Sequence, residues 1–432
     1  MTMRVTRVMT LAMTVALWGG PVGAAEAPIA IVGARIVSVS GPVLEKGTVV
    51  VANGKVAAVG VSVVVPPGAT VIDGTGATLY PGLIDGLTAI GLVEIQSVPG
   101  SVDTREIREV NAEARAWVAV NPSSEAIAVA RANGITAALA APVTGQSALI
   151  RLAGTSATEL VLKAPVALHM VYPTGRPPFD ISRLFEEPEL KTLEERQKEK
   201  KKNQEKELQQ LKNLLEAAKA HAAGLTAARA GEGEAKPDLS LESLSPFARG
   251  ELPVIVRADD EADIRGALTF AKEQGLKLIL AGGLEAWRCA DVLKASEVPV
   301  LLNVERLPGR RSDAYDAAYT VPARLHQAGV RFAIVSDETA QSRNLPYEAA
   351  MARAYGLPAA AALRAITLSP AEIFGVGEHL GSIEVGKDAN LFLASGDIMD
   401  HRTRVLRVLI DGKEQSLETR HTRLYQQFKD RP

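Results

Sequence analysis

The sequence is poor in cysteine, histidine and aromatic side chains. Its single cysteine, Cys289, cannot form a disulfide within the chain and excludes any metal site built from several cysteines. Aromatic residues make up only 4% of the chain. The available histidines are His169, His221, His326, His379, His401 and His421. A metal site would therefore have to use some of these histidines or carboxylates.

The chain also lacks an excess of charge of either sign. Its 48 Lys and Arg residues against 50 Asp and Glu residues give a formal net charge of −2, which provides no basic surface for nucleic acid. Apolar residues make up 47%, enough for a large core and too many for a disordered chain. After the first 25 residues, no apolar run reaches the ~20 residues of a membrane-spanning helix. We expect a small-molecule partner, no nucleic acid and no membrane span.

The first residues have the pattern of a secretory signal peptide. Arg4 and Arg7 precede a weakly polar to apolar stretch at residues 8–18, and small residues follow up to Ala24 and Ala25. Cleavage after either alanine is predicted, with an uncleaved anchor as the alternative. We predict a signal peptide at residues 1–25 and a periplasmic or secreted protein.

Both ends of the remaining chain are rich in strand patterns. Residues 26–80 contain short Val- and Ile-rich runs, two of them separated by Asn53-Gly54, a strong hairpin signal. Strand patterns return at residues 381–415, and residues 416–432 form a tail. These two segments are predicted to build one composite β-sandwich domain, with the rest of the chain inserted in its middle.

Residues 81–380 alternate short apolar strands with Ala-rich helical stretches, the pattern of a parallel sheet or barrel. Residues 184–246 interrupt this pattern, and residues 194–207 contain no apolar side chain. A solvated surface helix is the favoured interpretation of this polar insertion. A lid or a partner-docking arm is the alternative.

Three motifs resemble a known family. They are residues 71–76 (VIDGTG) with 81–85 (PGLID), residues 367–375 (TLSPAEIFG) and residues 381–389 (GSIEVGKDA). Their order and spacing resemble the amidohydrolase superfamily, in its imidazolonepropionase-like branch. The resemblance implies an α/β fold, a distorted (β/α)8 TIM-like barrel that carries a small composite β-sandwich domain. It also implies hydrolysis of C–N bonds with one or two divalent metals and an aspartate at the end of the eighth strand.

The resemblance also implies where metal-binding histidines should stand, and this chain has other residues there. The two histidine positions after the first-strand motif hold Leu87 and Ala89. The fifth-strand position holds Arg257, which stays protonated and cannot coordinate a cation. The sixth-strand position falls near residues 281–283, an Ala-Gly-Gly sequence that offers no ligand.

One family position is filled, since the apolar eighth-strand sequence ends at Asp337, which we predict as the catalytic residue. The alternative is a structural role, in which the Asp337 carboxylate caps the following turn. Arg257 and Asp259 are predicted to bind substrate. Arg257 could clamp a carboxylate or form a structural pair with Asp337 or Asp259, and the structural pair is slightly favoured. No metal ligand is assigned. A single divalent metal of the zinc type, held by Asp337, Asp259 and His169, stays open as an alternative, although a core histidine is the favoured interpretation of His169.

Two functions follow from the sequence. The first is an exported hydrolase of C–N bonds in non-peptide or cyclic amides, with an atypical or depleted metal site. The second is an inactive pseudoenzyme that serves as a ligand-binding or assembly subunit, as a homo-oligomer or paired with an active relative. A Rossmann-type dehydrogenase is discarded because the chain has no complete Gly-x-Gly-x-x-Gly fingerprint followed by a helix.

Overall fold

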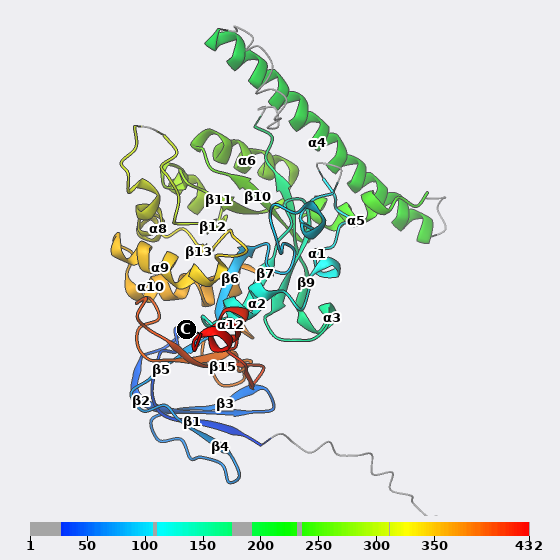
Figure 1. Ribbon diagram of the computed structural model, residues 1–432. Coiled ribbons are helices and arrows are strands. Elements are labelled where there is room, and N and C mark those ends of the chain that lie inside the picture. The colour runs from blue at the N-terminus through cyan, green and yellow to red at the C-terminus, as the bar shows by residue number, and fades with distance from the viewer. Residues whose placement is uncertain (1–26, 107–109, 175–191, 231–235, 311, 432) are drawn as a thin grey trace, which may run out of the picture.

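The computed structural model describes residues 27–106, 110–174, 192–230, 236–310 and 312–431 (Figure 1). The predicted signal peptide and parts of the predicted polar insertion lie outside these residues. Two eight-stranded sheets organise the described chain. Among the described helices, none combines the length and the apolar character that crossing a membrane requires.

The first sheet is a nearly closed barrel in which the strands follow chain order. Its strands are β6 (Leu83–Thr88), β7 (Ile135–Ala140), β8 (Gly145–Arg151), β9 (Val161–Val171), β10 (Pro253–Ala258), β11 (Lys277–Gly282), β12 (Val300–Leu302) and β13 (Phe332–Ile334). The first and last strands meet through the segment after β13, where the Asp337 N–H donates to the Leu87 carbonyl at 3.0 Å. The α/β class and the TIM-like barrel are therefore confirmed.

The distortion of the barrel lies at β8. This strand runs antiparallel to both β7 and β9, whereas the other neighbouring strands of the barrel are parallel. Only residues 141–144 connect β7 to β8, and so short a connection joins antiparallel strands, since a parallel pair needs a long crossover.

Helices and short turns connect the barrel strands or follow the last of them. They are η1 (Pro99–Ser101), α1 (Ala116–Ala119), α2 (Glu125–Arg131), α3 (Ala157–Leu160), α4 (Leu193–Arg229), α5 (Leu239–Ala248), α6 (Glu261–Gln274), η3 (Ala286–Cys289), α7 (Ala290–Ala295), α8 (Ala317–Ala328), η4 (Ser342–Asn344), α9 (Leu345–Ala354), α10 (Ala359–Ala365) and α11 (Leu368–Ile373). Helix α6 shows how the sequence sets their faces. Its buried residues Ile264, Ala267, Leu268 and Ala271 recur at helical spacing, and Gly275 ends the helix at a φ of 69°.

Apolar side chains fill both sides of the barrel wall. One buried cluster lies between the strands and the surrounding helices, and a second includes alternate residues of the strands. The second cluster includes Ile84, Leu139, Leu149, Ile255, Ile279, Leu301 and Ala333. The barrel interior is therefore a packed core, which leaves the strand ends as the place for a site.

The second sheet combines both ends of the chain. Its order is β16 (Lys413–Gln415), β15 (Val405–Ile410), β14 (Leu391–Ala394), β5 (Thr78–Pro81), β1 (Ile29–Ile36), β2 (Leu44–Ala52) and β3 (Lys55–Gly60), with β4 (Thr70–Asp73) also paired to β1. Asn53 and Gly54, both at positive φ, form the turn between β2 and β3. The segments before and after the barrel thus share one sheet, whereas the sandwich packing of two β layers stays a prediction. A last helix, α12 (Arg420–Phe428), follows this sheet.

Helix α4 is the main described part of the polar insertion. A capping box of Thr192 and Glu195 begins this 37-residue helix. Leu215 and Ala218, in its second half, are buried, and the Ala218 carbonyl accepts a hydrogen bond from Ser245 of α5 at 2.9 Å. Figure 1 shows the rest of α4 extending beyond the barrel.

Gly82 lies where the chain passes from the second sheet into the barrel. A Cβ atom there would overlap the side chain of Thr136 in β7. We expect Gly82→Ala to lower the free energy of unfolding by about 1–3 kcal/mol, measured by urea denaturation. Gly224→Ala is the control, because its Cβ would meet no atom within 4 Å in helix α4. That change should raise stability by about 0.5–1 kcal/mol, and equal effects of the two changes would contradict the packing described here.

Candidate functional site

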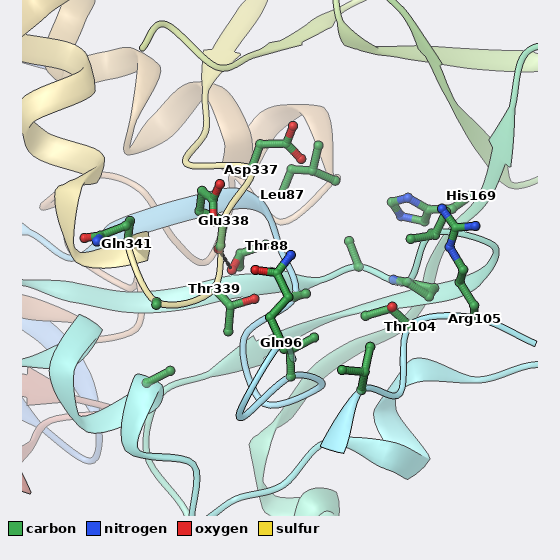
Figure 2. Close-up of a pocket in the computed structure, with 18 of the residues that line it drawn as sticks. Leu87, Thr88, Gln96, Thr104, Arg105, His169, Asp337, Glu338, Thr339 and Gln341 are labelled. Atoms are coloured by element: carbon green, nitrogen blue, oxygen red, sulfur yellow. Dashed lines mark hydrogen bonds between the residues drawn. The ribbon is translucent and has the colours of Figure 1, made fainter. Parts of the chain in front are cut away.

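A cavity of about 820 Å³ opens at the carboxyl ends of the barrel strands (Figure 2). The residues that line it near the strand ends are Leu87, Thr88, Ala89, Ala141, His169, Val171, Arg257, Ala281, Asp337 and Glu338. Strand register explains why some of these side chains converge. In the sheet, Ile255 lies opposite His169 and Arg257 lies opposite Val171, so alternation along both strands points all four toward the cavity that they line.

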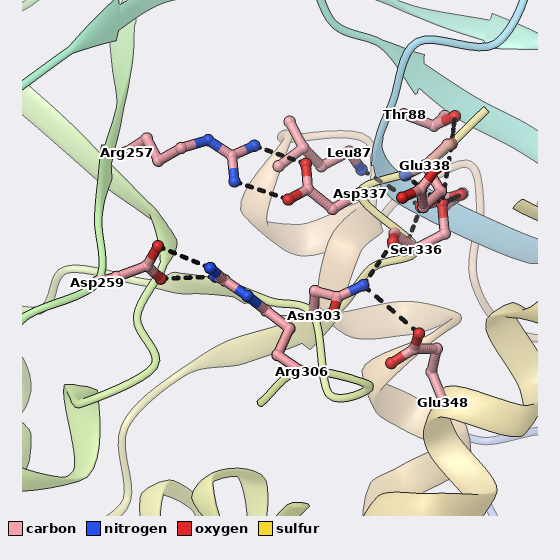
Figure 3. Close-up of polar contacts among 11 residues, drawn as sticks. Leu87, Thr88, Arg257, Asp259, Asn303, Arg306, Ser336, Asp337, Glu338 and Glu348 are labelled. Atoms are coloured by element: carbon pink, nitrogen blue, oxygen red, sulfur yellow. Dashed lines mark hydrogen bonds and ion pairs between the residues drawn. The ribbon is translucent and has the colours of Figure 1, made fainter. Parts of the chain in front are cut away.

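Arg257 and Asp337 form a two-pronged ion pair in the mouth of the barrel (Figure 3). The Arg257 Nη1 donates to Asp337 Oδ2 at 2.6 Å, and Nη2 donates to Oδ1 at 2.5 Å. The hydrogen bonds from Arg257 to Asp337 raise the pKa of the arginine, although burial acts against this. Both carboxylate oxygens of the predicted catalytic residue are therefore engaged by a cation.

Asp259 belongs to a different ion pair. Its carboxylate accepts hydrogen bonds from Arg306 Nη1 at 2.7 Å and Nη2 at 3.0 Å, and from the Leu284 N–H at 3.3 Å. Figure 3 shows this pair beside the Arg257 and Asp337 pair. Arg306 lines a second, smaller cavity of about 370 Å³, which shares Asp337, Glu338 and Gln341 with the first. Asp259 is not one of the described residues that line the larger cavity. Its role in binding substrate therefore stays a prediction.

A buried acid holds Ser336, the residue that precedes Asp337. Asp85 of β6 is fully buried and accepts hydrogen bonds from the Ser336 N–H at 3.1 Å and the Ser336 hydroxyl at 2.5 Å. Burial raises the pKa of Asp85 to about 7, against the lowering effect of these hydrogen bonds. Its carboxylate therefore joins the first strand of the barrel to the residue that precedes Asp337.

A second buried acid, Glu348 of α9, holds the segment after β12. Its Oε2 accepts hydrogen bonds from the N–H groups of Val304 at 2.8 Å and Glu305 at 2.9 Å. Burial raises the pKa of Glu348 to about 8. Asn303 bridges the two regions, since its amide donates to the Ser336 carbonyl at 2.5 Å and to Glu348 at 3.4 Å.

Sequence reasoning assigned no role to Asp85, Glu348 or Arg306. A signal for Asp85 existed, because a carboxylate inside an otherwise apolar strand segment must find hydrogen-bond partners when it is buried. Glu348 precedes the apolar residues 349–352 and carries the same signal, whereas Arg306 lies in a stretch of mixed polar and apolar residues that gives none.

His169 is a buried histidine that lines the cavity. It is 5% exposed, and burial together with the positive charge of Arg257 lowers its pKa to about 3, so its imidazole is neutral at ordinary pH. Its Nε2 atom is buried and has no hydrogen-bond partner among the described residues. His169 thus keeps one buried nitrogen that none of the described residues satisfies.

The residues around this nitrogen do not fit a catalytic zinc ion. Zinc sites use three protein ligands in fixed geometry, but Leu87 and Ala89 carry no donor, and both Asp337 oxygens are bonded to the Arg257 cation. In the part of the chain that the structure describes, no group of three or more His, Cys, Asp or Glu side chains is placed to hold a metal ion. The zinc site of Asp337, Asp259 and His169 therefore finds no support in this arrangement.

The carboxyl-terminal part of the chain matches a known family by sequence. Residues 315–414, which contain Asp337, match the model of the Amidohydrolase family. The curated protein "Amidohydrolase tasK" of Hapsidospora irregularis is 32% identical over 106 residues, which are 24% of this chain and 11% of that protein. The chain thus spans only about a tenth of the length of this curated relative.

Solved structures extend the similarity to nearly the whole chain. An amidohydrolase from Thermotoga maritima MSB8 is 28% identical with a TM-score of 0.77, over 90% of this chain and 99% of that one. A prolidase complexed with N-methylphosphonate-L-proline is 17% identical with a TM-score of 0.54, over 90% and 100% of the two chains, and it shows the fold alone. The similarity to the amidohydrolase superfamily is therefore confirmed, whereas the imidazolonepropionase-like branch stays a prediction.

The buried acids should make stability depend on pH. Both Asp85, with a pKa of about 7, and Glu348, with a pKa of about 8, hold a proton in the folded chain at pH values where the unfolded chain has lost it. We therefore expect the free energy of unfolding to fall as the pH rises from about 5 to about 8. Asp85→Asn should flatten part of this fall in urea denaturation at a series of pH values. An unchanged slope in the variant would contradict the assignment.

The coupling between Arg257 and Asp337 can be measured directly. Arg257→Gln and Asp337→Asn should destabilise less together than the sum of the two changes, with a coupling of about 1 kcal/mol because the pair is partly exposed and screened by solvent. The control is the pair of Arg353 and Asp397, which is held by one hydrogen bond and whose carboxylate is more exposed than that of Asp337. Its expected coupling is below about 0.5 kcal/mol. Additive effects at Arg257 and Asp337 would show that the pair is not formed in solution.

Proposed function

We propose that this relative of the amidohydrolase superfamily binds a small amide in the mouth of its barrel and hydrolyses its C–N bond. Arg257 and Asp337 carry out the reaction at the place where relatives of its branch would hold a metal. The observation that carries the proposal is the place of Asp337. It lies at the end of the last barrel strand, inside the residues that match the Amidohydrolase family, and it lines a cavity of about 820 Å³. Membership of the imidazolonepropionase-like branch and export through a signal peptide at residues 1–25 are parts of the same proposal.

The chemistry starts with an exchange of partners at Arg257. An amide carbonyl oxygen that enters the mouth accepts hydrogen bonds from the guanidinium, which releases Asp337 and polarises the carbonyl. The freed Asp337 carboxylate takes a proton from water, and the water oxygen attacks the carbonyl carbon. The C–N bond then breaks, and Asp337 returns the proton to the leaving nitrogen. Water is consumed, and a carboxylic acid and an amine are formed.

A second function is favoured by the same ion pair. Both Asp337 oxygens accept hydrogen bonds from Arg257 at 2.5–2.6 Å, and a ligand that leaves this pair intact leaves the aspartate engaged by the cation. In that case the barrel binds its ligand without turnover and serves as a ligand-binding or assembly subunit, as a homo-oligomer or with an active relative.

A hydrolysis assay separates the two functions. The purified chain is incubated with a panel of N-acyl amino acids and cyclic amides, and amine release is measured with and without EDTA. We expect turnover that EDTA leaves within about twofold, because the residues at the mouth do not fit a catalytic metal. Asp337→Asn should lower kcat/KM by at least about 100-fold, the usual loss for a general base.

The control variant is Asp397→Asn, which removes a half-exposed carboxylate outside the cavity and should keep full activity. Turnover that EDTA abolishes would overturn the metal-independent mechanism. Absence of turnover across the panel, with the fold intact by circular dichroism, would favour the non-catalytic function.

A further inference from the structure

The two cavities of the barrel mouth meet at Asp337. The larger one, of about 820 Å³, and the smaller one, of about 370 Å³, share Asp337, Glu338 and Gln341 in their walls. Both volumes fall in the range of about 300–1,000 Å³ that is usual for ligand pockets. A ligand whose middle lies at Asp337 can therefore extend into both cavities.

The walls of the two cavities differ in character. The wall of the larger cavity includes the apolar side chains of Val93, Val102, Val129 and Val143. Every described residue that lines the smaller cavity is polar, and the six that the larger cavity does not share are Asn303, Glu305, Arg306, Ser336, Asn344 and Glu348. A ligand that fits both cavities therefore has an apolar half and a polar half, which join at Asp337.

Buried hydrogen bonds fix the wall of the smaller cavity (Figure 3). Glu348 is 4% exposed, and its Oε2 holds the N–H groups that follow Asn303. Among the described residues, its Oε1 accepts one hydrogen bond, from Asn303 at 3.4 Å, which is longer than the usual range of about 2.7–3.2 Å. A ligand cation at Oε1 would favour the ionised form of this carboxyl, whose pKa burial raises to about 8.

The charges in this wall set the sign of the ligand group. Those of Arg306 and Asp337 are cancelled by the ion pairs described above. Glu305 and Glu338 form no ion pair with any described residue, and together with Glu348 they favour a cation over an anion. In the described part of the chain, no group of three or more His, Cys, Asp or Glu side chains is placed to hold a metal ion, so the cation that fits is an organic one.

We propose that the smaller cavity binds the amine half of the substrate through an ammonium group, while the larger cavity holds an apolar acyl half. The proposal rests on the proposed function, because it places the scissile amide at Asp337. The substrate class is an N-acyl diamine with an apolar acyl group, and hydrolysis releases the acid and the diamine. The reverse placement would bury an apolar chain against side chains that are all polar and would leave their hydrogen bonds unmade.

Three benzamides that differ in one terminal group test this subsite by isothermal titration calorimetry. N-(4-aminobutyl)benzamide carries an ammonium, N-pentylbenzamide has the same length without a charge, and 5-benzamidopentanoate carries a carboxylate. We expect the ammonium compound to bind at least about tenfold more tightly than the neutral one, and the carboxylate to bind most weakly. Glu305→Lys, a change at an exposed position, should weaken binding of the ammonium compound at least about tenfold and that of the neutral compound by less than about twofold.

Glu94→Lys is the matched control, because Glu94 is an exposed glutamate that lines the larger cavity alone. This variant should bind the ammonium compound within about twofold of the wild type. Equal binding of the ammonium and neutral compounds, an equal loss in both lysine variants, or no binding of the ammonium compound at millimolar concentration would overturn the subsite.

Release of benzoate, measured by chromatography on the same samples, separates this subsite from the proposed function. Binding that prefers the ammonium compound and depends on Glu305, without release of benzoate, removes the catalytic proposal and keeps the subsite. Release of benzoate at equal rates from all three compounds keeps the catalytic proposal and removes the subsite.

Discussion

The ion pair between Arg257 and Asp337 is the interaction on which the barrel mouth depends. It joins β10 to the segment after β13 with two hydrogen bonds of 2.6 and 2.5 Å, across 80 residues of sequence. Asp337 adopts a left-handed φ of 54°, a region that few residues other than glycine enter and that aspartate tolerates better than most, and its N–H donates to the Leu87 carbonyl. The pair thus fixes the acid that the family resemblance marks as catalytic and cancels its charge at the same time.

The closure of the barrel depends on buried polar groups as much as on strand pairing. β12 and β13 are each three residues long, so the sheet offers few ladder hydrogen bonds at its end. Asp85 supplies a substitute, because its carboxylate accepts the Ser336 N–H where a strand carbonyl would otherwise do so. Asn303 connects Ser336 to Glu348, which extends this support to α9. The segment that carries Asp337 is therefore held by hydrogen bonds to Leu87, Asp85 and Asn303.

The sequence predicted the architecture better than the contacts of the site. Strand and helix periodicity together with the family motifs indicated the barrel, and Asn53-Gly54 indicated the hairpin, because these signals are local. The pairing of Arg257 with Asp337 was one of several open alternatives. That Asp259 pairs with Arg306 could not be predicted, since it depends on the path of the loop after β12.

An arginine and an aspartate stand at the place where the family resemblance implies a metal. A crystal structure of the protein grown with excess zinc, with anomalous data collected at the zinc edge, tests this claim most directly. We expect an intact Arg257 and Asp337 pair and no anomalous peak within coordination distance, about 2.0–2.2 Å, of Asp337 or His169. An anomalous peak bonded to Asp337 and His169, with Arg257 turned away, would contradict it.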